Sequence, residues 1–278
     1  MTAVALAPPY TPIALSLRTP QGESAVAFEF DLDSGVQRAM HRDLAGGAFY
    51  EPETTLFILS VLRPGDRFVD VGGHVGYFTV IASSAVGNQG RVFAFEPAPA
   101  NYQRLVRHVA LNECRNVVPL HLAAAAEPGG VTLHLNSDND GGHALWDVRQ
   151  HPLNERSRAT PRTHQAWAVR IEDAVGSGPV RAMKLDVEGA ELDALRGAEA
   201  LLAGSDGVPF VVAEVNRGGL NAMGTSEEEL RGWMDQRGYD TWLMQVEAPQ
   251  LVRLEPGASL ATNSVFNVLF WKRGFALE

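Results

Sequence analysis

The chain has 278 residues, and its 33 acidic against 23 basic side chains leave a formal net charge of −10. A chain of this length fits one large domain, or one domain with an appendage. Its Lys and Arg residues form no dense cluster, which disfavours a nucleic-acid partner because phosphate contacts supply most of the affinity for nucleic acids.

Cysteine content and hydropathy indicate the compartment. Cys114 is the only cysteine, so neither an intrachain disulfide nor a zinc site built on CxxC pairs can form. The first ten residues lack the basic segment of a signal peptide, and no apolar run approaches the roughly 20 residues of a membrane helix. We expect a cytoplasmic protein without a membrane partner.

The first 50 residues form a predicted extension. Residues 13–18 and 25–32 alternate apolar and polar side chains on either side of the sequence PQGES, which predicts a β-hairpin. We expect this extension, residues 1–50, to cap the site of a main domain at 51–278.

Strand and helix patterns alternate from residue 52 onward. After a helix at 52–62, the patterns predict strand, helix, strand, helix and strand at 67–73, 74–87, 91–97, 100–112 and 116–126. This β-α-β-α-β order implies a parallel sheet with right-handed crossovers and hence an α/β fold.

The segment 127–170 interrupts this alternation. Short strands at 131–135 and 165–171 flank a polar stretch, and we expect an insertion over about 136–165 that faces the substrate, because long loops in compact domains are commonly functional. The α/β order then resumes with predicted elements at 179–189 (strand), 190–203 (helix), 209–216 (strand), 226–238 (helix), and 239–245, 249–255 and 264–273 (strands).

A glycine turn, DVGGHVG at 70–76, joins the first of the parallel strands to its helix. Glycine lets a ligand approach the backbone, and the helix that follows directs its first amide groups at that ligand. The spacing differs from G-x-G-x-x-G, and an acid at Asp70 suits an amine-bearing ligand better than a pyrophosphate. The predicted cofactor contacts here are Asp70, Gly72, Gly73, His74 and Gly76; a plain tight turn is the alternative.

Acidic residues follow three other predicted strands. Glu96 lies 20 residues after Gly76, where a carboxylate can accept hydrogen bonds from both ribose hydroxyls, or instead cap the next helix. Asp186 and Glu188 lie two apart and share a face of an extended strand, so either can orient a cofactor amine or accept a proton.

Two further acids and one histidine are secondary candidates. Glu191 lies in the first turn of a helix, where it either reaches the site or only favours the helix dipole. Glu214 closes a buried strand, where an acid requires a partner, and we expect it at the substrate. His143 lies in the polar insertion and is either a second candidate base or a solvated loop residue.

At these residues the chain resembles the FkbM family of methyltransferases. The matching strings lie in order between residues 64 and 216: FVDVGGHVGYFTVIA, VFAFEPAPANYQRLVRHVALN, MKLDVEGAELDALRGAEALL and VVAEVN. The resemblance implies a class I methyltransferase, Rossmann-like fold, with a seven-stranded and mostly parallel sheet whose last strand, over NVLFWKR, is antiparallel.

The resemblance also implies S-adenosylmethionine as the cofactor. The matching positions are Asp70, Gly72 and Gly76 in the first cofactor motif, Glu96 as the ribose acid, Ala123 and Ala124 where the adenine lies, and Asp186, Glu188 and Glu191 in the acidic motif. The family commonly has Ala-Asn where this chain has Gly73 and His74, so no role is carried over to position 74.

We therefore expect methyl transfer to a hydroxyl group of a small molecule, such as a sugar or a secondary metabolite. Holding the hydroxyl in line with the sulfonium methyl supplies much of the catalysis. Asp186 or Glu188 is the first candidate for the base, and His143 the second. We expect no metal, although Asp186, Glu188 and Glu214 offer the carboxylates that a divalent ion prefers.

Three alternatives stay open at this point. An amine of an amino sugar or a peptide undergoes the same displacement, which would make the enzyme an N-methyltransferase. An NAD-dependent oxidoreductase shares the glycine turn and the ribose acid, and a protein of this fold can also bind without catalysis. The acceptor, its regiochemistry and the oligomeric state, a homodimer included, are not indicated by any motif.

Overall fold

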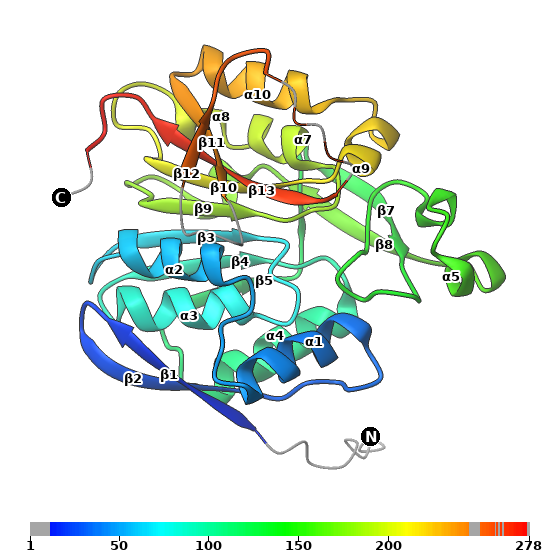
Figure 1. Ribbon diagram of the computed structural model, residues 1–278, viewed down its shortest axis with the longest axis horizontal. Helices are drawn as coiled ribbons and strands as arrows, with labels where there is room; N and C mark the ends of the chain where they lie inside the picture. Colours follow the sequence, from blue (N-terminus) through cyan, green and yellow to red (C-terminus); the bar gives the residue numbers. More distant parts are fainter. Residues whose placement is uncertain (1–11, 245–250, 259, 261, 263, 277–278) are drawn as a thin grey trace.

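The computed structural model describes residues 12–244, 251–258, 260, 262 and 264–276. Within this part of the chain an eight-stranded sheet lies at the centre, with helices on both of its faces (Figure 1). In sheet order the strands are β12 (Leu251–Leu254), β11 (Tyr239–Met244), β13 (Phe266–Lys272), β10 (Phe210–Val215), β9 (Ala182–Leu185), β3 (Arg67–Val71), β4 (Arg91–Phe95) and β5 (Val117–Leu120).

The strand directions confirm the predicted mostly parallel sheet. Strands β5, β4, β3, β9 and β10 run parallel, and β13, which contains residues 267–272 of the predicted last strand, lies antiparallel to both β10 and β11. The described sheet has eight strands rather than seven, because the predicted late strand β12 pairs with the outer edge of β11. Residues 245, 249 and 250 of the predicted late strands lie outside the described residues.

The two faces of the sheet bury separate apolar clusters. Side chains alternate across a strand, so Val69 belongs to one cluster and Phe68 to the other. The first face is covered by α6 (Ile171–Val175), α7 (Glu191–Arg196), α8 (Glu199–Leu202) and α10 (Glu227–Gln236). The second is covered by α1 (Gly35–Ala45), α2 (Pro52–Val61) and α3 (Tyr77–Val86), with α4 (Pro99–Leu111) beside α3.

The N-terminal hairpin forms as predicted, from β1 (Ile13–Thr19) and β2 (Gly22–Phe28). It buries Leu17 and Phe28 in the cluster that also contains α3. A helix that was not predicted, α1, follows it. Its N-cap is Ser34, whose hydroxyl oxygen accepts a hydrogen bond from the amide of Gln37.

Two of the predicted elements are each interrupted and form two shorter elements in the structure. The predicted helix 190–203 is split into α7 and α8 at Gly197, where a Cβ would lie 2.2 Å from the Ala125 carbonyl oxygen. The predicted strand 116–126 is split into β5 and β6 (Ala123–Ala124), which joins another sheet.

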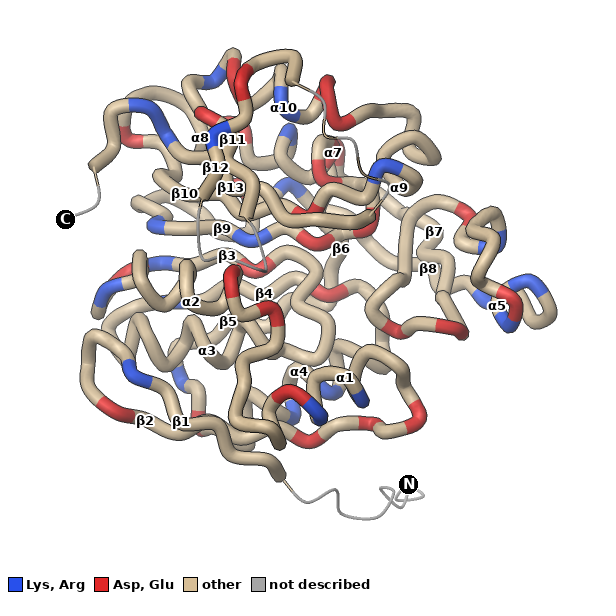
Figure 2. The backbone as a smooth tube through the Cα atoms, viewed as in Figure 1, with Lys and Arg blue, Asp and Glu red and all other residues tan. Residues whose placement is uncertain are grey.

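That second sheet has the order β6-β8-β7 and carries the insertion. Its longer strands are β7 (Gly129–Leu135) and β8 (Arg162–Val169), which pair antiparallel. The chain between them forms a short 3-10 helix, Val148–Gln150, and α5 (Glu155–Ala159). Basic and acidic residues are interspersed along the segment between β7 and β8, as expected for a solvated segment (Figure 2).

The helix α9 (Arg217–Ala222) follows β10 and was not predicted. Ser226 is the N-cap of α10, because its hydroxyl accepts from the amide of Glu229 at 3.1 Å. Among the described helices, none combines the length and the apolar character that crossing a bilayer would require.

Candidate active site

The site lies at the carboxyl ends of the parallel strands. One cavity, part of it open to solvent, is lined by residues at the carboxyl ends of β3, β4, β9 and β10. In parallel α/β sheets this edge is where ligands bind. The predicted residues that line it are Gly72, Gly73, His74, Glu96, Ala123, Ala124, His143, Asp186, Glu188 and Glu214.

The glycine turn brings the backbone to the cavity. Gly72 has a φ of 80°, and the amides of Gly72 and Gly73 donate to the Phe95 carbonyl oxygen at 3.0 and 2.8 Å. Gly76 has a φ of 89° and forms the N-cap of α3. Such left-handed conformations favour glycine, so the turn depends on these residues.

Three predicted residues lie outside the cavity lining: Asp70, Gly76 and Glu191. The Asp70 carboxylate is 1% exposed and accepts a hydrogen bond from the Thr79 hydroxyl at 2.5 Å. Glu191 accepts from the amides of Val187 and Gly189 at 3.2 and 3.0 Å. These acids therefore hold the shape of the two turns that border the cavity.

Glu96 directly follows β4, and it lines the cavity. Its Oε2 accepts from the amide of His74 at 2.8 Å and its Oε1 from the amide of Ala98 at 2.7 Å. Burial raises the pKa of Glu96 to about 8, although both hydrogen bonds favour the ionised form. The side chain thus joins the glycine turn to the end of β4.

An acidic cluster forms the other half of the cavity: Glu51, Asp186, Glu188 and Glu214. Lys184 donates to Oδ2 of Asp186 at 2.8 Å, and Asn216 donates to Oε2 of Glu188 at 2.7 Å. Glu188 has a φ of 54°, a strained conformation for a residue with a Cβ. The strained backbone at Glu188 therefore places its carboxylate in the acidic cluster.

Burial and mutual repulsion change the ionisation of the acidic cluster. Burial, together with the charge of Asp186, raises the pKa of Glu188 to about 8. The same two effects raise the pKa of Glu214 well above its usual range. Burial would lower the pKa of Lys184, but the nearby carboxylates of Asp186 and Glu51 raise it. Lys184 therefore stays charged, while the cluster holds protons at neutral pH.

The carboxylates also have the geometry for a cation. One oxygen from each of Asp186, Glu188 and Glu214 lies within 4.8 Å of the others. Oxygen ligands at such spacing suit a divalent ion such as Mg²⁺ or Ca²⁺. The ammonium group of Lys184 already forms an ion pair with Asp186, one of these three carboxylates, and so supplies a positive charge at this position.

His143 reaches the cavity from the insertion, yet it is a weak candidate for a base. Its Nδ1 accepts a hydrogen bond from the amide of Asn136 at 2.9 Å. Burial, with a contribution from His74, lowers the pKa of His143 to about 4. A neutral imidazole with one nitrogen already paired accepts a proton poorly at neutral pH.

Several lining residues escaped the sequence analysis because most of them come from the N-terminal segment and the insertion, while Asn101 lies on α4. They include Val36, Met40, Tyr50, Glu51, Asn101 and Asn139. Glu51 has a φ of 42°, and Asn267 of β13 donates to its carboxylate at 3.0 Å. The four-residue spacing of Val36, Met40 and Leu44 after Ser34 would have predicted α1, whereas no local pattern marks Glu51.

A family model described as a methyltransferase FkbM domain matches residues 70–241, more than half of the chain. Methyltransferase 1 of Beauveria bassiana (strain ARSEF 2860) is 30% identical over 151 residues, which cover 49% of this chain and 60% of the relative. Methyltransferase sdnD of Sordaria araneosa is 27% identical over 161 residues, covering 49% and 62%. The chain thus spans about 60% of the length of these curated relatives.

Solved structures of methyltransferases also align with the chain. The crystal structure of methyltransferase FkbM from Methylobacillus flagellatus KT is 15% identical, with a TM-score of 0.45, over 84% of this chain and 54% of that one.

Proposed function

The chain belongs to the FkbM methyltransferase family, and from that premise we propose that it transfers a methyl group from S-adenosylmethionine to a hydroxyl group of a small molecule. One observation carries the proposal: a single cavity joins the glycine turn and Glu96 to the acidic cluster. The first half suits the adenosyl part of the cofactor, and the second half suits a group that loses a proton.

The cofactor would lie along the carboxyl ends of β3, β4 and β5. The carboxylate of Glu96 is placed to accept hydrogen bonds from the ribose hydroxyls. Ala123 and Ala124, each 5% exposed, offer an apolar wall to the adenine. The amino-acid end would reach Gly72 and Asp186, where the backbones after β3 and β9 meet.

The acceptor would lie at the acidic cluster. Its hydroxyl oxygen attacks the methyl carbon, the carbon–sulfur bond breaks, and neutral S-adenosylhomocysteine leaves. The hydroxyl proton passes to a carboxylate. We propose Glu188 for this step, because it lines the cavity and its raised pKa, about 8, makes its ionised form a stronger proton acceptor, while Asp186 is ion-paired with Lys184.

N-methylation is the second candidate, because the acidic cluster would also attract an amine-bearing acceptor. The family membership removes the support for an NAD-dependent oxidoreductase. A cytoplasmic location stays a proposal that rests on the lone Cys114. A small acceptor rather than a nucleic acid fits the acidic cavity and the net charge of −10.

Calorimetry with S-adenosylhomocysteine tests the cofactor half of the proposal. The wild type should bind it, and Glu96→Gln should weaken binding roughly threefold to tenfold, since an ordinary hydrogen bond is worth about 0.5–1.5 kcal/mol. The control is Glu23→Gln, which changes an exposed acid of the hairpin. No binding by the folded wild type would sink the proposal.

Methyl transfer from labelled cofactor to a panel of sugars, phenols and amines tests the acceptor half. Transfer to hydroxyl compounds supports the first candidate. Transfer confined to amines would replace it with N-methylation.

A further inference from the structure

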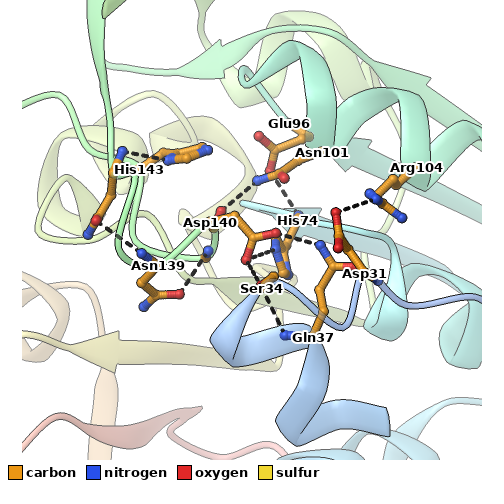
Figure 3. Close-up of polar contacts among 12 residues, drawn as sticks. Asp31, Ser34, Gln37, His74, Glu96, Asn101, Arg104, Asn139, Asp140 and His143 are labelled. Atoms are coloured by element: carbon orange, nitrogen blue, oxygen red, sulfur yellow. Dashed lines mark hydrogen bonds and ion pairs between the residues drawn. The ribbon is translucent and has the colours of Figure 1, made fainter. Parts of the chain in front are cut away.

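Asp140, in the insertion between β7 and β8, joins three separate segments of the chain (Figure 3). Its Oδ1 accepts a hydrogen bond from the Ser34 hydroxyl at 2.5 Å, and its Oδ2 one from the side-chain amide of Gln37 at 2.5 Å. Its Oδ1 also lies 3.5 Å from Nε2 of His74. Asn101 of α4 donates to the backbone oxygen of Asp140 at 2.8 Å.

These partners belong to segments that line the cavity. Ser34 and Gln37 begin α1, which contributes Val36 and Met40 to the lining. Asp140 is followed by four lining residues of the insertion, Gly141, His143, Ala144 and Leu145. Asp140 therefore fastens two parts of the cavity wall to each other and to the glycine turn.

The donors also keep Asp140 charged. Burial alone would raise the pKa of Asp140, but the adjacent His74 ring and the hydrogen bonds from Ser34 and Gln37 lower it well below the usual range. Gln37 is 1% exposed, and its own Oε1 accepts from the amide of Asp31 at 2.8 Å. The contact is thus an ionised carboxylate held by oriented donors.

His74 extends this contact to the ribose acid. Its backbone amide donates to Oε2 of Glu96, while its ring faces Asp140 (Figure 3). Its φ is 49°, in the left-handed region that residues with a Cβ rarely adopt. One residue in a strained turn therefore contacts both the predicted ribose acid and the insertion.

We propose that the contact between His74 and Asp140 is a latch that holds α1 and the insertion over the bound cofactor, with Asp140 as a positioning residue. The inference rests on the proposed function, which places the ribose at Glu96. Glu96 and Ala123 line the same cavity and are each only 5% exposed, so the walls that Asp140 joins limit access to them. By linkage, a latch that favours cofactor binding is itself strengthened by the cofactor.

The test measures release of S-adenosylhomocysteine by stopped-flow competition. Asp140→Asn and His74→Ala should each speed release roughly tenfold, because the contact between the His74 ring and the Asp140 carboxylate is lost. The KM for the cofactor should rise in proportion, with kcat changed far less. The double variant should release no faster than the more severe single variant, because both changes break one contact.

Asp147→Asn is the matched control, since Asp147 lies in the same insertion but bonds to Arg149. Its release rate should equal that of the wild type. Hydrogen exchange should show residues 34–45 and 136–145 protected by S-adenosylhomocysteine in the wild type and less so in Asp140→Asn. Thermal unfolding of each variant identifies a general folding defect.

Two outcomes would overturn the latch. Release unchanged in Asp140→Asn would show that the contact does not retain the cofactor. Fully additive effects of the two changes would show that His74 and Asp140 act separately. Both outcomes require that the wild type binds S-adenosylhomocysteine, so they are distinct from failure of the proposed function, in which the wild type does not bind.

Discussion

Gly72 and Asp186 are in backbone contact, since a Cβ on Gly72 would lie 1.9 Å from the carbonyl oxygen of Asp186. Gly72 follows β3 and Asp186 follows β9, which are neighbours in the sheet. The turn that we propose to face the cofactor and the strand end that begins the acidic cluster are therefore positioned by one steric contact.

Replacing Gly72 with Ala should abolish cofactor binding and destabilise the fold. The added Cβ meets backbone that cannot move aside, and the φ of 80° adds about 1–2 kcal/mol of strain. Calorimetry and thermal unfolding measure the two effects. Gly47→Ala is the control, because Gly47 has a φ of 77° with nothing within 4 Å of a Cβ. Equal losses in both variants would show that strain alone matters.

The methyl-transfer rate should rise with pH through about 8. Glu188 accepts a proton only when ionised, and its pKa of about 8 means that the protonated, inactive form prevails at lower pH. A profile of kcat/KM from pH 6 to pH 9.5 checks the direction. Glu188→Gln should lower the rate roughly 100-fold and remove the rise, whereas Asp193→Asn on α7 should leave both unchanged. A flat wild-type profile would contradict the assignment.

Removal of divalent ions should leave methyl transfer unchanged. Lys184 already neutralises part of the acidic cluster through its 2.8 Å contact with Asp186. The measurement compares chelator-treated enzyme with enzyme given Mg²⁺ or Mn²⁺. Loss of activity that either ion restores would instead assign a metal to Asp186, Glu188 and Glu214.

Acidification should destabilise the protein through His108. Burial lowers the pKa of His108, whose Nδ1 lies 2.6 Å from the Val75 carbonyl oxygen and whose Nε2 accepts from the amide of Glu29 at 2.9 Å. Because the unfolded state takes up the proton first, this contribution to stability is present above pH 6.5 and is lost as the pH falls below it.

Urea unfolding at pH 7.5 and pH 5.5 measures this loss, which is at most about 1.4 kcal/mol per pH unit for one proton. His108→Gln should lower stability at pH 7.5 and flatten the dependence. His41→Gln in α1 is the control. An identical pH dependence in His108→Gln and the wild type would exclude His108 as its source.

Local sequence patterns were sufficient to predict many of the residues that line the cavity. Glycines that follow an apolar strand, an acid after the next strand, and the acids Asp186 and Glu188 after a third are readable because each depends on near neighbours in the chain. The predicted extended strand through Glu188 was wrong, because β9 ends at Leu185 and Glu188 lies in a turn with a φ of 54°. Parallel strands end at one edge of a sheet, so the sequence predicted that these residues converge, and they do.

The direction of a side chain, which the sequence does not give, decided whether a predicted acid lines the cavity. Asp70 and Glu191 belong to the predicted motifs, yet they turn inward to Thr79 and to the amides of Val187 and Gly189. A motif places a carboxylate within one turn of a site, but packing decides whether it faces the ligand or supports the loop.

By itself, the sequence determined the α/β order, the family and the principal carboxylates, because periodicity and turn residues act over a few neighbours. Tertiary structure alone decided that Glu51 joins Asp186, that Asp140 meets Ser34 and His74, and that β12 extends the sheet. Ser34 and Asp140 are 106 residues apart. Contacts between such distant segments depend on how the whole chain packs, which no local pattern encodes.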